Sequence, residues 1–386
     1  MDNKRVAIQT CFIDNYGACL QAYAIQKEVN KALGYEGSLI LPFDRYVWFR
    51  TFDSNKDKLK TFLKMILHFR NKSFKNNAKI HTNFEKFRNN YLTFDCRKLT
   101  RNYKYFYELN NTFDSFVCGS DVIWNPTFRR ENLWYDMLRF AEDDKKIIAY
   151  APSFGISHFP SGGGLLKEAK NYLGRFTSLS CREDEGVDII KNQFGLSAEH
   201  VLDPTLLLSR EEWSLLTKKS KAKVKKDYVV IYMFDDMPLD KIVNKILEET
   251  NYDIYLFPFG NIKNDIFKNK RIHNACVMSG PIEFVYLIGH AKLVLANSLH
   301  ALAFSINMNT PFVIFNRDEL DEEHSINSRM RSMTRMFKFE NRIVKFSSFF
   351  DSRISDYTQM NFNESNSILL KQREFSKKYL KDAING

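Results

Sequence analysis

Short apolar segments typical of buried strands alternate with helical segments in two separate parts of the chain. In the first part, residues 6–10 and 38–41 are strand-like, and apolar residues between them recur at the three- and four-residue spacing of a helix. Gly34 follows this helix where a C-cap is expected. A strand, a helix and a second strand in this order imply a parallel sheet, because the helix carries the chain back to the same edge.

The alternation continues and then resumes after a lysine-rich segment. Further strands are predicted at 116–118, 147–149, 178–180, 228–234, 254–259, 293–296 and 312–315, with helices at 239–249, 282–291 and 301–306. A chain of 386 residues is long enough for two cores. The sequence therefore predicts an α/β fold with two Rossmann-like domains, over 1–210 and 227–345, that face each other across a cleft. A polar helix is predicted at 363–386, and we expect it to pack back on the first domain.

Residues 45–113 interrupt the alternation as a basic, aromatic insertion in the first domain. Part of this insertion has an apolar stripe at helical spacing, formed by Leu59, Phe62, Leu63, Ile66 and Leu67. Such a stripe, with cations on the other faces of the helix, can rest on an anionic membrane surface. It can equally pack on the domain as an ordinary helix, and the sequence leaves both interpretations open.

The net charge of +11 favours anionic partners, such as nucleic acids, anionic membranes or phosphorylated substrates. The densest basic segment, 218–226, holds six lysines in nine residues. These charges repel one another, so we interpret the segment as a solvated surface near the domain junction. No recognisable nucleic-acid motif accompanies it, and we expect no nucleic-acid partner.

The remaining composition bears on location and on metal binding. No run of 18 apolar residues is present, and the first five residues are too few and too polar for a secretory signal. The six cysteines lack Cys-x-x-Cys spacing, which predicts buried thiols in a reducing cytoplasm and no zinc site. We therefore expect a cytoplasmic protein without a metal.

Polar residues follow several predicted strands, at the strand ends where α/β proteins build their sites. His300 comes just after the strand at 293–296 and opens a helix, so it is either a structural histidine or a proton donor near neutral pH. Arg182 follows another strand and precedes Glu183. Its guanidinium group either forms a structural ion pair or holds a carboxylate or phosphate.

Three further loops are candidates for binding. Asp121 lies in a glycine turn, where it can cap the next element or orient a ligand hydroxyl, and Ser153 lies in a similar strand-end loop. The turn at Asn15, Tyr16 and Gly17 opens a helix and so offers backbone N–H groups to an anion. A group of arginines follows the last predicted strand: Arg317, Arg329, Arg331, Arg335 and Arg342.

Taken in order, these loops resemble the polysaccharide pyruvyl transferase family. The resemblance begins at the Asn-Tyr-Gly-Ala turn at 15–18 and rests on five further motifs. These are Gly-Ser-Asp-x-x-Trp-Asn-Pro at 119–126, Tyr-Ala-x-Ser-Phe-Gly at 150–155, Ser-x-Arg-Glu at 180–183, Asp-Pro-Thr-Leu-Leu-Leu at 203–208 and Asn-Ser-Leu-His at 297–300. The resemblance implies a GT-B-like fold, phosphoenolpyruvate as donor, a sugar as acceptor, and neither metal nor cofactor.

The resemblance also implies roles for individual residues. His300 is similar to the general acid of the family, and Arg182 is similar to its donor-binding cation. Ser298 stands where some members carry an arginine, so we expect a second donor cation from Arg329 or Arg317. The remaining expected contacts are Ser298 and Leu299 for the donor, and Asn15, Tyr16, Gly17, Asp121 and Ser153 for the acceptor.

The implied reaction is the formation of a pyruvate ketal on a hydroxyl pair of a hexose in a surface polysaccharide such as a capsule. By analogy, we expect a 4,6-ketal on galactose. The basic charge and the apolar stripe favour a lipid-diphosphate-linked acceptor and peripheral contact with the anionic inner face of the membrane. The alternative is a nucleotide-sugar-dependent GT-B glycosyltransferase. That enzyme would need acidic side chains or backbone groups that bind the nucleotide, and no acid pair lies near the loop at 297–300.

Overall fold

The computed structural model describes residues 4–34, 36–40, 72–95, 104–222, 224–234, 237–258, 264–316 and 327–386. Three features named above lie outside these residues: the apolar stripe at 59–67, Cys96 and Arg317. Among the described helices, none is long and apolar enough to cross a bilayer.

The N-terminal half is built on a parallel four-stranded sheet in the order β2-β1-β3-β4. Its strands are β1 (Arg5–Gln9), β2 (Glu36–Leu39), β3 (Ser115–Cys118) and β4 (Lys146–Ala149). Helix α1 (Tyr16–Leu33) connects β1 to β2, with the Asn15 side chain as its N-cap. Gly34 ends the helix at φ 65°, a left-handed conformation that glycine adopts without steric cost. The predicted strand–helix–strand unit is therefore confirmed.

Shorter elements complete this half. The helices are α3 (Lys72–Tyr91), α4 (Lys104–Glu108), α5 (Pro126–Arg129), α6 (Leu133–Asp136), α7 (Leu165–Leu173), α8 (Asp184–Asn192) and α9 (Arg210–Thr217). The 3-10 turns are η2 (Leu109–Asn111), η3 (Arg130–Asn132), η4 (Gly162–Gly164) and η5 (Pro204–Leu206). Strands β5 (Ser180–Cys181) and β6 (Glu199–His200) form a separate parallel pair that ends beside η5.

The C-terminal half has a parallel five-stranded sheet in the order β11-β10-β7-β8-β9. Its strands are β7 (Tyr228–Tyr232), β8 (Asp253–Phe257), β9 (Ile272–Asn274), β10 (Leu293–Ala296) and β11 (Phe312–Ile314). The helices among them are α10 (Leu239–Glu249), α11 (Ala275–Met278), α12 (Pro281–Gly289) and α13 (Leu299–Met308), with the 3-10 turn η6 (Asn264–Lys268). Strand β9 was not predicted, because three residues with two polar side chains carry no strand periodicity.

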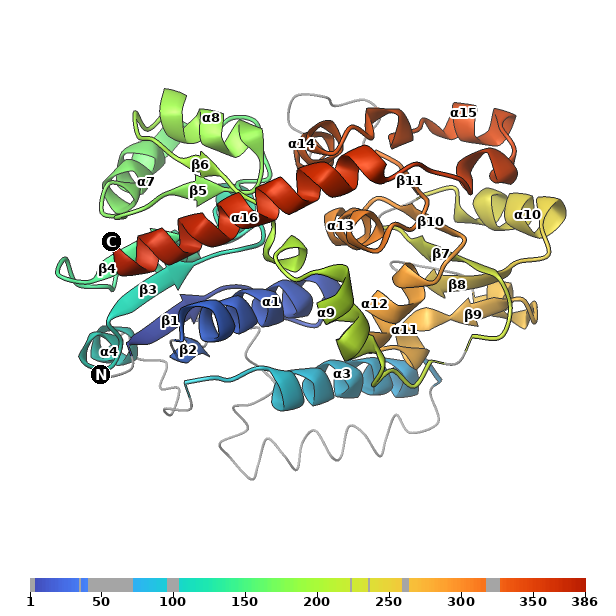
Figure 1. Ribbon diagram of the computed structural model, residues 1–386, viewed down its shortest axis with the longest axis horizontal. Helices are drawn as coiled ribbons and strands as arrows, with labels where there is room; N and C mark the ends of the chain where they lie inside the picture. The colour runs from blue at the N-terminus through green and yellow to red at the C-terminus, as the bar shows by residue number, and fades with distance from the viewer. Residues whose placement is uncertain are drawn as a thin grey trace.

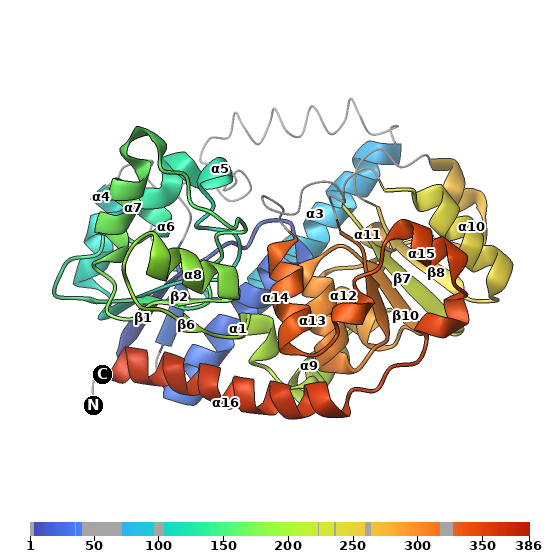
Figure 2. The ribbon, with the colours of Figure 1, turned by 90° about the horizontal axis from the view of Figure 1, so that it is seen from above.

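The last elements run back over the molecule. They are α14 (Ser328–Met336), η7 (Glu340–Arg342), α15 (Phe346–Asp351), η8 (Ile354–Tyr357) and the long helix α16 (Asn363–Asn385). Helix α16 lies along both halves (Figure 1), and Figure 2 shows it joining the two lobes along one side. Its Tyr379 hydroxyl donates to the Ala149 carbonyl at 2.9 Å, and its Arg373 guanidinium donates to the Asn307 side chain at 3.1 Å. The helix thus contacts β4 in the first half and α13 in the second.

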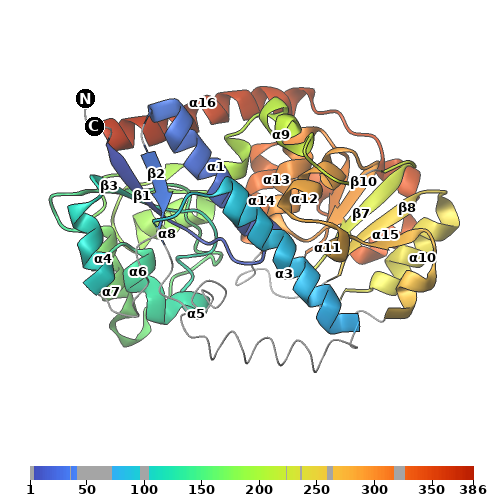
Figure 3. The same ribbon diagram turned by 90° about the horizontal axis from the view of Figure 1, so that it is seen from below.

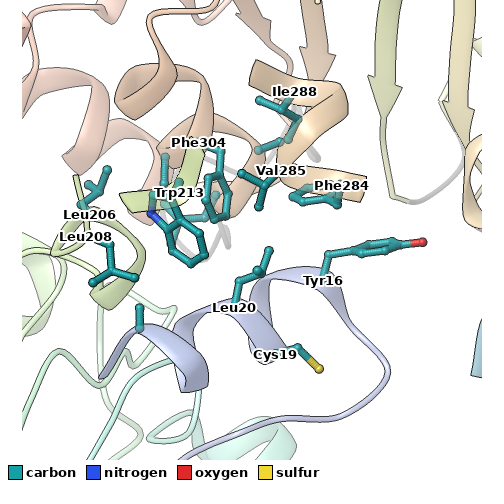
Figure 4. Packing of buried hydrophobic residues seen from close by; sticks show 14 of the residues in the cluster. Tyr16, Cys19, Leu20, Leu206, Leu208, Trp213, Phe284, Val285, Ile288 and Phe304 are labelled. Carbon is teal, nitrogen blue, oxygen red and sulfur yellow. The ribbon is translucent and has the colours of Figure 1, made fainter. Parts of the chain in front are cut away.

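The two halves share one hydrophobic core rather than a wet interface. A single cluster of buried residues includes Val6 and Leu20 from the first half and Val230 and Phe304 from the second. In Figure 4, Leu20 of α1 points toward Trp213, Phe284 and Val285. Burial of this apolar surface opposes separation of the two halves.

Helix α3, inside the predicted insertion, crosses between the halves (Figure 3). Its Arg88 guanidinium contacts the Asp14 carboxylate at 2.6 Å in the first half, and its Asn83 amide donates to the Ser279 carbonyl at 3.3 Å in the second. Phe84 is buried against Tyr16, with ring centroids 4.9 Å apart. The sequence indicated only that the alternation of strands and helices is interrupted here. A mainly polar helix that buries a few aromatic rings has a weak periodicity of apolar residues, so α3 was not predicted.

Candidate active site

His300 lies in the first turn of α13, directly after β10, as predicted from the sequence. The loop before it is fixed by Asn297, whose side chain accepts from the Phe234 N–H at 2.7 Å and donates to the Phe234 carbonyl at 2.8 Å. These bonds tie the end of β10 to the end of β7. The His300 side chain is therefore held at the boundary of the two halves, with 7% of its surface exposed.

A buried carboxylate, Asp203, connects His300 to Arg182. Asp203 caps η5, and its Oδ1 accepts from both the backbone N–H and the hydroxyl of Thr205. Its Oδ2 is left to face the Arg182 Nη1 at 2.9 Å and the His300 Nε2 at 3.7 Å. Asp203, named from the sequence only as the first residue of the motif at 203–208, is therefore the centre of a charge network formed by Asp121, Arg182, Glu183, Asp203 and His300. The Asp-Pro-Thr order is typical of a capping aspartate, which is the local role of Asp203.

Arg182 is buried among acids supplied by three loops. Besides Asp203, its guanidinium faces Asp121 Oδ1 at 3.6 Å and Glu183 Oε2 at 3.8 Å. Glu183 in turn accepts from the Phe154 N–H at 2.9 Å, which holds the loop at 150–155 against the start of α8. Asp121 receives its own support from the Val122 N–H at 2.8 Å. Arg182 therefore forms the structural ion pairs that the sequence left as one of two interpretations, and these ion pairs lie beside His300.

Several polar atoms in this region are buried without a hydrogen-bond partner. Among the described residues, these include the Nε2 of His300, the Nε and Nη2 of Arg182, and the Oγ of Ser153. Leaving such groups unpaired costs about 1–3 kcal/mol each, and more for charged groups. An anionic, oxygen-rich ligand would satisfy the two guanidinium nitrogens.

Arg329 reaches the same region from α14. It is buried, and its charge lowers the pKa of both Asp121 and His300. Helix α14 is docked on the start of α8, where the Ser332 hydroxyl accepts from the Asp184 N–H at 3.1 Å and Arg335 contacts Glu185 at 3.3 Å. Arg329, one of the two arginines expected to supply a second donor cation, thus acts on the charges of the network from the other half of the molecule.

The charges of the site set its protonation. Burial lowers the pKa of His300 below its usual value of 6.5, although Asp203 and Asp121 oppose the shift. Burial raises the pKa of Asp203, but His300 and Arg182 lower it more, and the net shift is downward. Asp121 and Asp203, whose pKa values are both lowered, are thus ionised at neutral pH, while the lowered pKa keeps the His300 imidazole mainly neutral.

Two residues predicted as contacts have side chains that pack in the core. Tyr16 does not face the polar network: its ring stacks on Phe284 with centroids 4.8 Å apart, and its hydroxyl contacts the Ser279 carbonyl at 3.4 Å. Figure 4 shows it among the apolar residues between the halves. The Leu299 side chain likewise packs in the shared core. Burial of these two large side chains in the shared core is favourable, which explains why they pack there.

The other predicted residues lie at or beside the network. Asn15 uses its side-chain oxygen to cap α1 by accepting from the Ala18 N–H at 3.1 Å. Ser298 is the N-cap of α13 by position, but its side chain makes no capping bond. The Ser153 N–H donates to the Asp121 carbonyl at 2.9 Å, which places this serine next to the Asp121 loop. In the described part of the chain, no group of three His, Cys, Asp or Glu residues could hold a metal ion.

Because Gly17 has no side chain, the His300 ring can lie directly against the first turn of α1. A Cβ at Gly17 would lie 1.9 Å from His300 Nδ1, closer than any real contact allows. We expect Gly17→Ala to displace the ring and, with His300 as the expected general acid, to lower kcat/KM by about 10²-fold, because misplacement of a catalytic group by about 1 Å has effects of this size. Steady-state kinetics of Gly17→Ala and of the parent chain will measure the change in kcat/KM.

Gly162→Ala is the matched control, since nothing lies within 4 Å of a Cβ added there. Overpacking at Gly17 should also lower the free energy of unfolding by about 1–3 kcal/mol, which a urea titration measures. Unchanged kinetics in Gly17→Ala would show that the ring position seen here is not needed for catalysis.

Comparisons with known proteins agree with this architecture. Among solved structures, the chain is similar to the UDP-N-acetylglucosamine 2-epimerase from Rickettsia bellii, with a TM-score of 0.52, 11% identity and coverage of 99% of this chain and 97% of that chain. It is similar to the wall teichoic acid polymerase TagF, with a TM-score of 0.51, 11% identity and coverage of 98% and 88%. It is also similar to MnaA from S. aureus, with a TM-score of 0.50, 8% identity and coverage of 96% of each chain. At these identities the likeness shows the fold alone, a GT-B-like pair of Rossmann-like domains.

The family of the chain follows from a family model of its sequence rather than from its fold. No curated protein sequence matches it significantly. The family model described as polysaccharide pyruvyl transferase matches residues 15–319, which includes the turn at α1, all the loops of the charge network in the first half, and His300. The chain is a transferase enzyme that belongs to the polysaccharide pyruvyl transferase family.

Proposed function

We propose that the chain transfers the pyruvyl group of phosphoenolpyruvate to two hydroxyls of a hexose, which yields a cyclic ketal and inorganic phosphate. The acceptor we propose is galactose, ketalated at O4 and O6, in a lipid-diphosphate-linked precursor of a surface polysaccharide. The observation that carries the proposal is that His300 and Arg182 face the same buried carboxylate of Asp203, while the imidazole Nε2 and two guanidinium nitrogens make no hydrogen bond. An acid beside an anion clamp is what this reaction requires.

The first step is protonation of the donor. The methylene carbon of phosphoenolpyruvate takes a proton from His300, and the adjacent carbon becomes an oxocarbenium-like centre. One sugar hydroxyl attacks that centre and releases its proton. Phosphate then leaves with the electrons of its C–O bond, and the second hydroxyl attacks the same carbon and closes the ketal. Of the two hydroxyl protons, one restores His300 and the other passes to the departing phosphate. In the proposed reaction no redox change occurs and no cofactor takes part.

The cations of the network suit the charges of the donor. Phosphoenolpyruvate carries a carboxylate and a phosphate, and an arginine fork binds either group through paired hydrogen bonds. We assign this clamp to Arg182 and Arg329, which come from opposite halves of the chain. The N-terminus of α13, at Ser298, adds backbone N–H groups that favour an anion.

The acceptor side is assigned to the loops of the first half. Asp121 and Ser153 lie close together here. The Asp121 carboxylate can accept hydrogen bonds from sugar hydroxyls, and the Ser153 hydroxyl can accept or donate them. Asn15 and Gly17, at the start of α1, border the same region. Tyr16 is not included, because its ring is part of the core.

The reaction should lose activity as pH rises, since the acid must be protonated. Burial lowers the pKa of His300 in the free enzyme, so kcat/KM should fall as pH rises through a value below 6.5. The negative charges of bound donor raise the pKa of the imidazole, so kcat should fall only at higher pH. Parallel pH profiles of both parameters measure the difference. A kcat limb at the same pH as that of kcat/KM, or lower, would contradict this role of the donor.

The proposed reaction can be tested directly. The purified chain is incubated with phosphoenolpyruvate and candidate saccharides, and mass spectrometry looks for a gain of one pyruvate less one water, matched by released phosphate. Thermal stabilisation by phosphoenolpyruvate, but not by nucleotide sugars, is expected. Stabilisation by a nucleotide sugar alone would instead favour the alternative function, a nucleotide-sugar-dependent glycosyltransferase. The similar epimerase from Rickettsia bellii is named for a nucleotide sugar.

A further inference from the structure

A groove on the surface of the first half is not used by the proposed chemistry. It has a volume of about 350 Å³ and lies between α1 and the end of α3, lined by Tyr23, Lys27, Lys31 and Tyr91 among others. The Lys27 ammonium lies 5.6 Å from the Tyr23 ring centroid and 3.3 Å from its hydroxyl. We call these four residues the basic groove.

The lysine-rich segment after α9 extends the basic groove. The Lys219 ammonium lies 5.2 Å over the Tyr91 ring, which places this segment at the edge of the groove. Lys218 and Lys221 are exposed beside it. One turn earlier on α9, Leu215 has 60% of its surface exposed, although an apolar side chain of this size is usually covered. Cations, tyrosines and an exposed leucine are thus adjacent.

Two acidic residues near this surface have partners. Glu212 is bound to Lys31 at 2.8 Å. Glu283 accepts from the backbone N–H groups of Gly280 and Lys221. Lys218, Lys219 and Lys221 add three exposed positive charges at the edge of the groove, which attract anions.

We propose that the basic groove, together with Leu215 and the lysines at 218–221, is a docking surface for the anionic headgroups of a lipid bilayer. Lysines near a charged bilayer add favourable energy residue by residue, and tyrosine and leucine suit the headgroup level. The surface combines all three, whereas a nucleic-acid site would call for a recognisable base-reading or backbone-tracking motif. Figure 3 shows α1, α3 and α9 on one face of the molecule.

The proposal deepens the proposed function, since it rests on a lipid-linked acceptor being met at a membrane. Helix α1 connects the charge network to the basic groove, because Gly17 lies against the His300 ring and the groove begins at Tyr23. At about 1.5 Å per residue, that separation is roughly 9 Å along the helix axis. A surface that docks on lipid headgroups would bring the charge network near the glycan attached to such a lipid.

Vesicle co-sedimentation tests the surface. The full chain is mixed with vesicles of phosphatidylcholine alone or with added phosphatidylglycerol, at low and at high salt. We expect binding only to the anionic vesicles, and weaker binding at high salt. The double variant Lys27→Glu/Lys219→Glu should lower the partition coefficient by about 10–100-fold, because two favourable charges become repulsive. Leu215→Ser should lower it less.

The control is Lys167→Glu/Lys170→Glu, the same charge change on the exposed side of α7, which lies away from α3 and α9 in Figure 1. This variant should bind vesicles nearly as the parent chain does. Equal losses in both double variants would overturn the proposal, because net charge alone would explain them. Binding of a short DNA duplex without binding of vesicles would also overturn it.

A second readout separates this proposal from the proposed function. Pyruvyl transfer to a lipid-free saccharide should be unchanged in Lys27→Glu/Lys219→Glu, because neither lysine belongs to the charge network. If transfer occurs but vesicles are not bound, the docking surface is wrong and the reaction stands. If vesicles are bound but no saccharide is pyruvylated, the docking surface stands and the reaction is wrong.

Discussion

Replacing His300 with glutamine should lower kcat by about 10²–10⁴-fold, the usual contribution of a general acid. Glutamine is close to histidine in size and polarity, so it can fill the space beside Gly17 without delivering a proton. The donor is held by arginines in this scheme, so its affinity should change little. Kinetics at saturating phosphoenolpyruvate, together with donor-induced thermal stabilisation, measure the two effects separately.

The control for this variant is His290→Gln, at the end of α12 and exposed to solvent, which should keep full activity. A His300→Gln enzyme with the rate of the parent would mean that the proton comes from another group. Loss of donor affinity as large as the loss of rate would instead make His300 a binding residue. The fall of kcat at high pH should be absent from the residual activity, since the titrating acid is gone.

Replacing Arg182 with alanine should lower the free energy of unfolding by about 3–5 kcal/mol, the cost of removing one partner from a buried ion pair. Asp203 and Glu183 are fully buried, and both face the guanidinium group. Without it, their charges lose their nearest cation in the network. The sequence alone suggested that this change would act mainly on donor binding, but the structure adds a large effect on stability. Urea titration measures the unfolding free energy, and calorimetry measures donor binding.

Two variants separate these effects. Arg182→Lys keeps the charge but loses the planar fork, so it should lose donor affinity with a smaller loss of stability. Asp203→Asn in the Arg182→Ala background should restore part of the stability, because one unpaired carboxylate is removed. An Arg182→Ala chain that is as stable as the parent would show that the carboxylates are not held as ions in the folded state.

Local patterns were sufficient for most of the secondary structure. Helix α10 and strand β10 begin and end where apolar periodicity predicted, because each has a clear repeat and flanking polar residues. Helix α3 was missed, since its buried face is narrow and its remaining residues are polar. Strand boundaries shifted by one or two residues where backbone pairing, rather than side-chain pattern, sets the end of the strand.

The candidate site was predicted in part. His300, Arg182 and Asp121 were singled out because each follows a buried strand, the usual place for a site in α/β proteins. Their strands, β10, β5 and β3, belong to three different sheets, so their meeting depends on the packing of those sheets. The importance of Asp203 could not be read from its neighbours, since its partners are distant in sequence. Tyr16 was misassigned for the same reason: its motif indicated a site, while its ring is surrounded by residues from α3 and α12.

The sequence by itself determined the α/β class, the order of the elements and the loops that bear polar groups, because strand and helix periodicity and turn residues act over a few neighbouring positions. Only the tertiary structure decided which of those groups meet. Gly17, Asp203 and His300 come from separate parts of the chain, and their contacts depend on how the shared core brings the two halves together. Long-range packing selects these contacts from many that local pattern allows, and it is this packing that buries the imidazole among charges.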